Sequence, residues 1–279
     1  MSIVTVENLV KVYKNAFKLD NISFGVERGS ICAIIGDSVS GKTQLLEILA
    51  GIKFAQQGIV DIPGDKVRYV PADAVRYDVT AQELFRHTKK IYGLSGEEDW
   101  QCLCEEFGVD YRRRLLDMTY LENRCAAMIN SLISYPEVLI LDEPYRYLSE
   151  KIYLKLLDLI KKRCSEEMTA IVSCSRYSNI EGYADQYIYL HEGDLLKSGY
   201  VNDDFKLWKM VTVFSSSFKN LEEFNIVPVV KKSKSISFIY KEDSKNLLSI
   251  LEKIGCTDFL VEELTLEEQL FENYERWRD

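Results

Sequence analysis

No run of about 18 consecutive apolar residues, the length that a membrane-spanning helix requires, occurs in this 279-residue sequence. The first residues, MSIVTVENLVKVY, also lack the basic start, apolar stretch and small-residue cleavage site of a secretory signal peptide. We therefore expect a chain that does not cross a membrane by itself, so that any role at a membrane depends on a partner.

An excess of positive charge is also missing. The formal net charge is −9, from 35 Lys and Arg against 44 Asp and Glu, whereas nucleic-acid-binding domains usually carry a basic face. Arg112–Arg114 form a basic run, but such a run more often lies on a solvated helix face. We expect no nucleic-acid partner.

The seven cysteines include no pair of CxxC motifs, which argues against a zinc site. Their odd number and irregular spacing favour reduced thiols in a cytosolic protein. Internal repeats and low-complexity segments are absent as well. The length allows one large domain, or one large and one small.

Hydrophobic patterns alternate between strands and helices. Short apolar runs in the first 30 residues predict antiparallel strands at a sheet edge. Continuous apolar runs predict strands buried on both faces at 31–35, 138–141 and 169–173. Helical spacing predicts helices at 42–50 and 151–163, and a helix-rich segment at about 78–135. A hairpin is predicted around Glu192–Asp194.

The pattern changes after about residue 206. A strand pair is predicted at 226–241, an amphipathic helix at 244–255 and a further helix at 264–277. We therefore place one domain at 1–206 and a small accessory α+β domain at 207–279.

The segment Gly36–Thr43, GDSVSGKT, matches the phosphate-binding pattern GxxxxGK[ST] in full. It follows a predicted buried strand and precedes a predicted helix, which is the required context; a chance glycine-rich turn is the alternative. Glycines let backbone N–H groups wrap phosphates, and the helix N-terminus adds partial positive charge. Lys42 is expected to reach the β- and γ-phosphates, and Thr43 to bind Mg²⁺. The predicted nucleotide-binding residues of this loop are Gly36, Asp37, Ser38, Val39, Ser40, Gly41, Lys42, Thr43 and Gln44.

A second motif, VLILDEP, completes such a site. The predicted strand 138–141 delivers Asp142 to the metal. Glu143 is then placed to polarise the attacking water as a general base, so Glu143 and Lys42 are the predicted catalytic residues. An acidic strand end at the surface is the alternative, but the long helical segment between the two motifs favours the functional interpretation.

With these motifs in hand, residues 3–205 resemble the ATP-binding cassette (ABC) family. The resemblance is carried by three segments: VENLVKVYKNAFKLDNISFGVERGSICAIIGDSVSGKT, LISYPEVLILDEP and ADQYIYLHEGDLLKSG. It implies an α/β fold, a P-loop NTPase cassette with a RecA-like core, an antiparallel β subdomain and a helical subdomain. In that family the aromatic residue ending the first strand stacks on adenine, which matches Tyr13; an ordinary strand aromatic is the alternative.

Four elements depart from the family pattern. Ala72 stands at the Q-loop glutamine, with Asp73 beside it, Ser149 at the D-loop aspartate, and Ser175 at the switch histidine. The signature, which contacts the nucleotide of the opposite subunit, reads Thr119–Glu122. There Tyr120 and Leu121 replace two glycines, and Glu122 adds a negative charge that would repel phosphate. These changes favour nucleotide binding over fast turnover.

The resemblance implies the ATP-binding subunit of an ABC transporter that uses ATP and Mg²⁺. Its expected partners are a transmembrane permease and a second cassette, in a homo- or heterodimer, on the cytoplasmic face of the cell membrane. The ending EELTLEEQLFENYE is similar to the small domain of bacterial drug, antibiotic and lantibiotic exporter ATPases, so we expect an exporter. Two alternatives stay open: a non-hydrolysing regulatory ATP-binding module, and a soluble ABC ATPase unrelated to transport.

Overall fold

The structure of the protein is a computed structural model. The residues that it describes are 2–13, 17–73, 77–95, 98–201, 208–214, 228–232, 234–241, 244–254, 256, 258–264 and 268–269. The chain divides into two compact units, Met1–Tyr200 and Val201–Asp279. The domain boundary predicted at 206–207 lies outside the described residues, and the two units are treated separately below.

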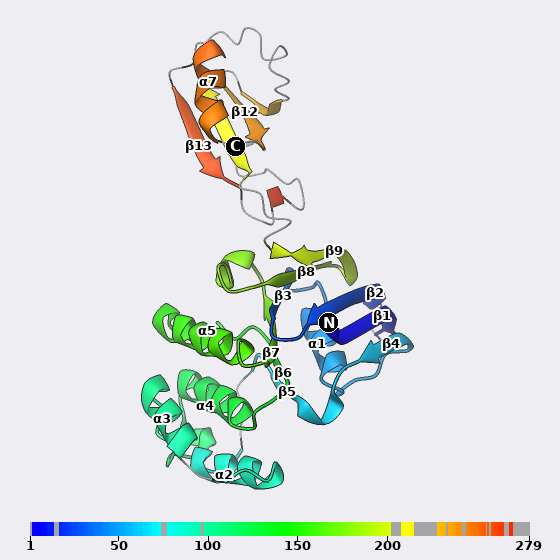
Figure 1. Ribbon diagram of the computed structural model, residues 1–279, viewed down its shortest axis with the longest axis vertical. Coiled ribbons are helices and arrows are strands. Elements are labelled where there is room, and N and C mark those ends of the chain that lie inside the picture. Colours follow the sequence, from blue (N-terminus) through cyan, green and yellow to red (C-terminus); the bar gives the residue numbers. More distant parts are fainter. Residues whose placement is uncertain are drawn as a thin grey trace. The chain divides into compact units, whose positions relative to one another are not determined.

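The first unit is built on a nine-stranded mixed sheet (Figure 1). Its strands are β1 (Ser2–Val12), β2 (Lys18–Glu27), β3 (Ile31–Ile35), β4 (Gln57–Asp61), β5 (Val67–Val70), β6 (Val138–Leu141), β7 (Thr169–Cys174), β8 (Gln186–His191) and β9 (Asp194–Tyr200). They follow the spatial order β4-β1-β2-β9-β8-β3-β7-β6-β5. The core strands β8-β3-β7-β6-β5 are parallel, whereas β4-β1-β2 form an antiparallel end that meets β9 at one residue pair, Asp20 and Asp194.

The strand predictions for this unit are confirmed. β3, β6 and β7 are buried along their whole length, as their continuous apolar sequences require of strands covered on both faces. The predicted hairpin is formed by β8 and β9, with Glu192 and Gly193 at positive φ in its turn. β4, which has only five residues and is mostly exposed, was not predicted.

Five helices of the first unit are α1 (Lys42–Leu49), α2 (Ala81–Ile91), α3 (Glu98–Phe107), α4 (Tyr120–Leu132) and α5 (Glu150–Cys164). α1 and α5 confirm the predicted helices, and α2, α3 and α4 form the predicted helix-rich segment. In the described part of the chain, no helix combines the length and apolarity needed to span a bilayer.

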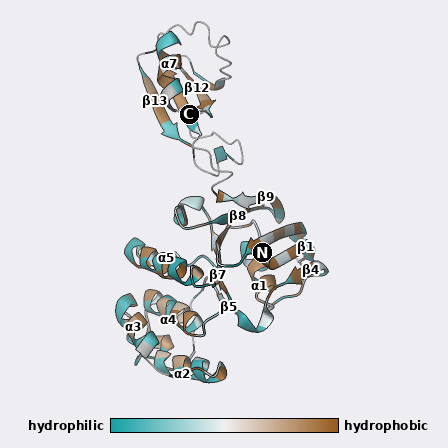
Figure 2. Ribbon diagram, in the orientation of Figure 1, coloured by the Kyte–Doolittle hydropathy of each residue, from teal (hydrophilic) through white to brown (hydrophobic). Residues whose placement is uncertain are grey.

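The helix that follows the phosphate loop, α1, is held in place by its buried side chains. Leu45, Leu46 and Leu49 of α1 pack into the core cluster that contains Ile34 of β3 and Ile140 of β6. Burial of these apolar side chains is the main force that holds α1 against the sheet. α5 buries one stripe, Tyr153, Leu156, Leu157 and Ile160, and carries both hydrophilic and hydrophobic residues along its length (Figure 2).

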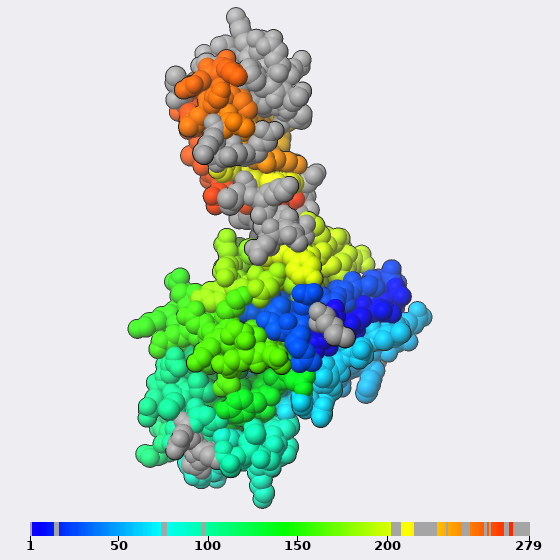
Figure 3. Space-filling view, viewed as in Figure 1, coloured from blue at the N-terminus to red at the C-terminus, as the bar shows by residue number. Residues whose placement is uncertain are grey.

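The helices α2, α3 and α4 lie together on one side of the first unit, and the antiparallel strands occupy another part of the surface shown in Figure 3. Trp100 of α3 is buried between two aromatic rings. Its ring centroid lies 5.5 Å from that of Phe85 on α2 and 5.0 Å from that of Tyr111. The interpretation of Arg112–Arg114 as a helix face is wrong, because these residues lie in the turn before a short 3-10 helix, Leu115–Asp117.

The second unit contains a four-stranded antiparallel sheet in the order β11-β12-β10-β13. Its elements are β10 (Lys209–Phe214), β11 (Pro228–Lys231), β12 (Ser235–Tyr240), α7 (Ser244–Ile254) and β13 (Phe259–Glu263). Leu247 and Leu251 of α7 pack in one cluster with Val211, Val213 and Phe238. The predicted strand pair and first helix are confirmed, β10 and β13 were not predicted, and the helix predicted at 264–277 lies almost wholly outside the described residues.

A buried ion pair between α2 and α3 offers a test of this packing. Lys89 is 6% exposed, and its Nζ lies 2.8 and 3.0 Å from the Asp99 carboxylate oxygens. We expect Asp99→Asn to lower the free energy of unfolding of the first unit by about 3 kcal/mol, because it leaves a buried ammonium uncompensated. Urea denaturation would measure the loss. As a control, Asp20→Asn breaks an exposed pair with Lys18 and should change stability by less than about 1 kcal/mol; equal losses for the two variants would contradict the assignment.

Candidate nucleotide-binding site

The phosphate loop connects the buried strand β3 to the N-terminus of α1. Gly41 precedes the helix with a φ of 98°, a left-handed conformation that glycine adopts without strain. A Cβ atom on Gly41 would lie 2.7 Å from the Phe17 ring, and one on Gly36 would clash with the Leu190 carbonyl oxygen and Ser40 Oγ. Both motif glycines are therefore required by the fold of the loop itself, and the loop leads into the N-terminus of α1, where the helix dipole favours an anion.

Lys42 lies inside this loop. Its side chain is 4% exposed, and Nζ donates to the Gly36 and Asp37 carbonyl oxygens at 2.8 and 2.5 Å. Burial lowers the pKa of Lys42, and the carboxylate of Glu143, whose Oε1 lies 3.9 Å from Nζ, opposes that shift. The loop thus encloses a positive charge that phosphate oxygens would recognise.

Asp142, directly after β6, binds side chains from three other elements, α1, β5 and β7. It is fully buried. Its Oδ2 accepts hydrogen bonds from Thr43 Oγ1 at 2.7 Å and from the Tyr69 hydroxyl at 3.3 Å, and its Oδ1 accepts from Ser173 Oγ at 2.6 Å. The Thr43 hydroxyl and the Asp142 carboxylate are hard oxygen ligands of the kind that Mg²⁺ prefers. This donor set fits the ion, and Thr43 and Asp142 are the residues that would hold it.

Glu143 is held in an uncommon backbone conformation. Its φ is 42°, and a side-chain-bearing residue in the left-handed region costs of order 1–3 kcal/mol unless its surroundings enforce it. Its backbone N–H donates to Ser173 Oγ at 2.9 Å. The carboxylate lies 3.9 Å from Lys42 and 3.5 Å from Arg146, so the predicted general base stands beside the phosphate loop.

Tyr13 packs near Phe17, and Phe17 in turn lies against the phosphate loop. Its ring centroid is 6.0 Å from that of Phe17, whose own ring is the group that a Cβ on Gly41 would meet. Lys11 and Lys53 place their Nζ atoms 5.9 and 5.5 Å from the Tyr13 centroid. Burial raises the pKa of the Tyr13 hydroxyl, which has no hydrogen-bond partner among the described residues. Sequence reasoning missed Phe17, whose aromatic character so close to Tyr13 was the available signal.

The remaining loop residues line the path from β3 to α1. Asp37, Ser38 and Val39 are exposed, whereas Ser40 is buried and donates from Oγ to the Asp37 carbonyl oxygen. Gln44 is half-buried on α1. The structure thus brings Gly36–Thr43, Asp142 and Glu143 together at the carboxyl ends of the inner strands β3 and β6.

The segment Thr119–Glu122 begins α4 with a complete capping box. Glu122 N donates to Thr119 Oγ1, and Thr119 N donates to Glu122 Oε2, which satisfies two of the amide groups that a helix N-terminus otherwise exposes. The Glu122 carboxylate also accepts two bonds from Arg113, at 2.9 and 3.0 Å. The negative charge at Glu122, which was expected to repel phosphate, is therefore paired with Arg113, and this pairing weakens the expected repulsion.

Bulky groups surround this helix start. Tyr120 stacks on Tyr147, with centroids 5.1 Å apart and planes at 27°, and both rings are about half exposed. Ser149 is the N-cap residue before α5, but its side chain makes no capping hydrogen bond in the described structure. Ser175 Oγ shares a 2.8 Å hydrogen bond with the Tyr145 hydroxyl, and Ala72 is half-buried beside Pro71.

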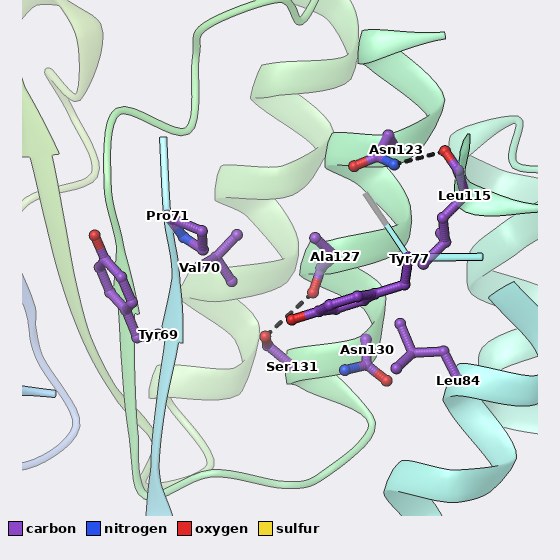
Figure 4. Close-up of a pocket in the computed structure, with 10 residues that line it drawn as sticks. All are labelled: Tyr69, Val70, Pro71, Tyr77, Leu84, Leu115, Asn123, Ala127, Asn130 and Ser131. Carbon is purple, nitrogen blue, oxygen red and sulfur yellow. Dashed lines mark hydrogen bonds between the residues drawn. The ribbon is translucent and has the colours of Figure 1, made fainter. Parts of the chain in front are cut away.

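A cavity of about 220 Å³ lies beside the site, between β5 and the helices α2 and α4 (Figure 4). It is lined by Tyr69, Val70, Pro71, Tyr77, Leu84, Leu115, Asn123, Ala127, Asn130 and Ser131. Tyr69 belongs both to this lining and, through its hydroxyl, to the Asp142 cluster. In Figure 4 the Tyr69 side chain lies on the opposite side of β5 from Val70 and Ala127, so its ring points away from the centre of the cavity.

Comparison with known proteins agrees with this geometry. Residues 19–146 match the model of the ABC transporter family. An uncharacterized ABC transporter ATP-binding protein of Methanocaldococcus jannaschii is 29% identical over 72% of this chain and 78% of its own length. A ribose import ATP-binding protein of Caldanaerobacter subterraneus is 25% identical over 72% of this chain, which spans only 45% of that relative.

Solved structures show the same fold. The structure of an ATP-binding subunit of an ABC transporter superimposes with a TM-score of 0.67 at 22% identity, covering 72% of this chain and 91% of that one. Together with the phosphate loop, the Asp142 cluster and the mixed sheet, these similarities confirm the expected cassette fold. The first unit therefore has the fold of an ATP-binding cassette, and its residues 19–146 match the ABC transporter family, whose ATP-binding proteins are ATPases.

Proposed function

We propose that the first unit binds ATP with Mg²⁺ and works as the ATP-binding subunit of a transporter, with slow turnover by the isolated chain. The observation that carries this proposal is the convergence of Lys42, Thr43, Asp142 and Glu143, with Thr43 and Asp142 joined by a 2.7 Å hydrogen bond. Lys42 and the loop amides recognise the phosphates, since charge-assisted hydrogen bonds to phosphate are strong. Tyr13 and Phe17 supply aromatic surface beside the loop for the base.

Each of these residues has a separate task. Thr43 and Asp142 hold Mg²⁺, which when bound neutralises phosphate charge. Glu143 accepts the proton of the attacking water, and its fixed backbone keeps the carboxylate near Lys42. Ala72, Ser149 and Ser175 lack the amide, carboxylate and imidazole groups that the family uses at these positions, and this supports slow turnover.

The state of the α4 N-terminus bears on the partner cassette. The side chains of Thr119 and Glu122 accept hydrogen bonds from each other's backbone N–H groups, and the half-exposed ring of Tyr120 stacks on Tyr147. A helix N-terminus of this kind offers few free donors to a phosphate. We therefore propose a heterodimer, in which a second cassette with an intact signature completes the site built on Lys42, and a permease binds the pair at the inner face of the membrane.

The direction of transport rests on the C-terminal region alone. The similarity of residues 262–275 to the small domain of bacterial exporter ATPases supports an exporter. The relatives do not add to this, because one of them is named as a ribose import protein.

A regulatory module is the second candidate function. Two observations favour it: the capping box formed by Thr119 and Glu122, and the hydrogen bond between Ser175 and Tyr145. Both engage residues at positions that the family uses for hydrolysis. In that case ATP occupancy alone would switch the conformation of a complex.

Two substitutions separate binding from turnover. We expect Lys42→Ala to weaken ATP-Mg binding roughly tenfold or more, since hydrogen bonds to charged groups contribute about 1.5–3 kcal/mol. Glu143→Gln should keep the affinity but remove the proton acceptor and hence the phosphate release. Calorimetric titration and a phosphate-release assay measure the two effects. If the chain is a regulatory module, only the Lys42 change will affect the function of the complex in cells, whereas an ATPase loses function with either.

Restoring the family signature tests the role of the α4 N-terminus. In a Glu143→Gln background with ATP and Mg²⁺, we expect the chain to stay monomeric by light scattering. Adding Tyr120→Gly, Leu121→Gly and Glu122→Gln should raise the dimer fraction, because backbone can then approach a phosphate. Lys42→Ala in the restored chain is the control and should abolish the gain. ATP-driven dimerisation of the chain with its own Thr119–Glu122 segment would refute the heterodimer proposal.

A further inference from the structure

Arg124 is a fully buried arginine on α4. Its exposed fraction is 0%, although arginine is among the residues most rarely buried completely. It occupies a position on the apolar side of the helix, one turn before the buried Met128. Burial lowers the pKa of Arg124, and the nearby Asp142 carboxylate opposes the shift. A side chain of this kind is costly to bury, so its hydrogen-bond partners show what it does.

The guanidinium joins three backbone carbonyl groups from two strands. One nitrogen donates to the Pro71 carbonyl oxygen, just after β5. A second nitrogen, Nη2, donates to the Asp142 carbonyl oxygen at 3.2 Å and to the Glu143 carbonyl oxygen at 3.4 Å, just after β6. The planar fork of arginine suits such a set, because its donors point in fixed and divergent directions. Arg124 thus ties a helix of the α2–α4 segment to the backbone that carries the candidate metal ligand and general base.

Glu143 is held from both sides by this arrangement. Ser173 Oγ accepts a hydrogen bond from its N–H, and Arg124 donates one to its carbonyl oxygen. A glutamate with a φ of 42° persists only where surrounding contacts enforce that conformation. Ser173 supplies one such contact from β7 and Arg124 supplies a second from α4, while the Arg146 backbone N–H donates to the same Glu143 carbonyl oxygen at 3.1 Å.

We infer that Arg124 is a positioning residue, which fixes the backbone of Asp142 and Glu143 and makes their geometry depend on the position of α4. The phosphate loop, which connects β3 to α1, makes no hydrogen bond with Arg124 in the described part of the chain. Loss of the fork should therefore disturb the metal and base groups while leaving the recognition of phosphates by the loop intact. This inference rests on the proposed ATP-Mg site.

Nucleotide affinity with and without metal is the first measurement. We expect Arg124→Lys, which keeps the charge but loses the fork, to change the Kd for ATP in EDTA by less than about twofold. In Mg²⁺ the Kd should rise about tenfold, as seen for changes to groups that orient metal ligands. Arg114→Met, which removes an exposed arginine paired with Asp78, is the matched control and should change neither value. An equal loss of affinity in both conditions, or no loss in either, would overturn the inference.

Hydrogen exchange gives a second readout that needs no nucleotide. In Arg124→Lys we expect faster amide exchange at 142–147, apart from Pro144, which has no amide hydrogen, and at Ala72 and Asp73, which follow Pro71. Exchange in α1 should be unchanged. Arg124→Met repeats the test without the charge, in case the lysine of Arg124→Lys retains some of the hydrogen bonds. Thermal unfolding of each variant, measured in parallel, shows whether the fold is kept. Unchanged exchange at 142–147 would refute the positioning role. If the unaltered chain binds no ATP, the proposed function fails, whereas the exchange result still decides the role of Arg124.

Discussion

The carboxylate of Asp142 is the group on which the rest of the candidate site depends. It lies fully buried at the end of β6 and accepts hydrogen bonds from Thr43 on α1, Tyr69 on β5 and Ser173 on β7. A buried carboxylate is tolerated only where such donors replace water. Because these donors come from three other elements, the same interactions that satisfy Asp142 also set the distance between the phosphate loop and the strand ends.

The neighbouring positive charges have a matching role. Lys42 is enclosed by the loop carbonyls, and Arg124 by the carbonyls that follow β5 and β6. Both cations are buried, and both lie near acidic groups of the Asp142–Glu143 pair. The site is therefore pre-organised by charges of both signs, an arrangement that stabilises substrate and transition-state charge without reorganising solvent.

Sequence patterns predicted the parts of the fold that depend on local rules. Continuous apolar runs located β3, β6 and β7. The glycine pattern located the phosphate loop, because the end of the motif coincides with the start of α1 at Lys42. The short, exposed β4 carries little periodicity, so it was missed. Arg124 could not be assigned a partner, since its acceptors at Pro71 and Glu143 are far away in the chain and are backbone atoms. The charged residue on an apolar helix stripe was the only local sign. The role of Tyr13 and the domain boundary at 206–207 stay predictions.

The junction between the two halves of the nine-stranded sheet has a consequence for nucleotide selection. β2 meets β9 at the single pair Asp20 and Asp194, so few backbone hydrogen bonds keep the sheet continuous there. Tyr13 belongs to the antiparallel half, whereas the phosphate loop follows a core strand. Phe17 and Leu19 of the antiparallel half lie against Gly41 of the phosphate loop. If Tyr13 contacts the base, as we propose, the side-chain volumes of Phe17 and Leu19 would therefore help to set the separation between the base and the phosphates that the site accepts.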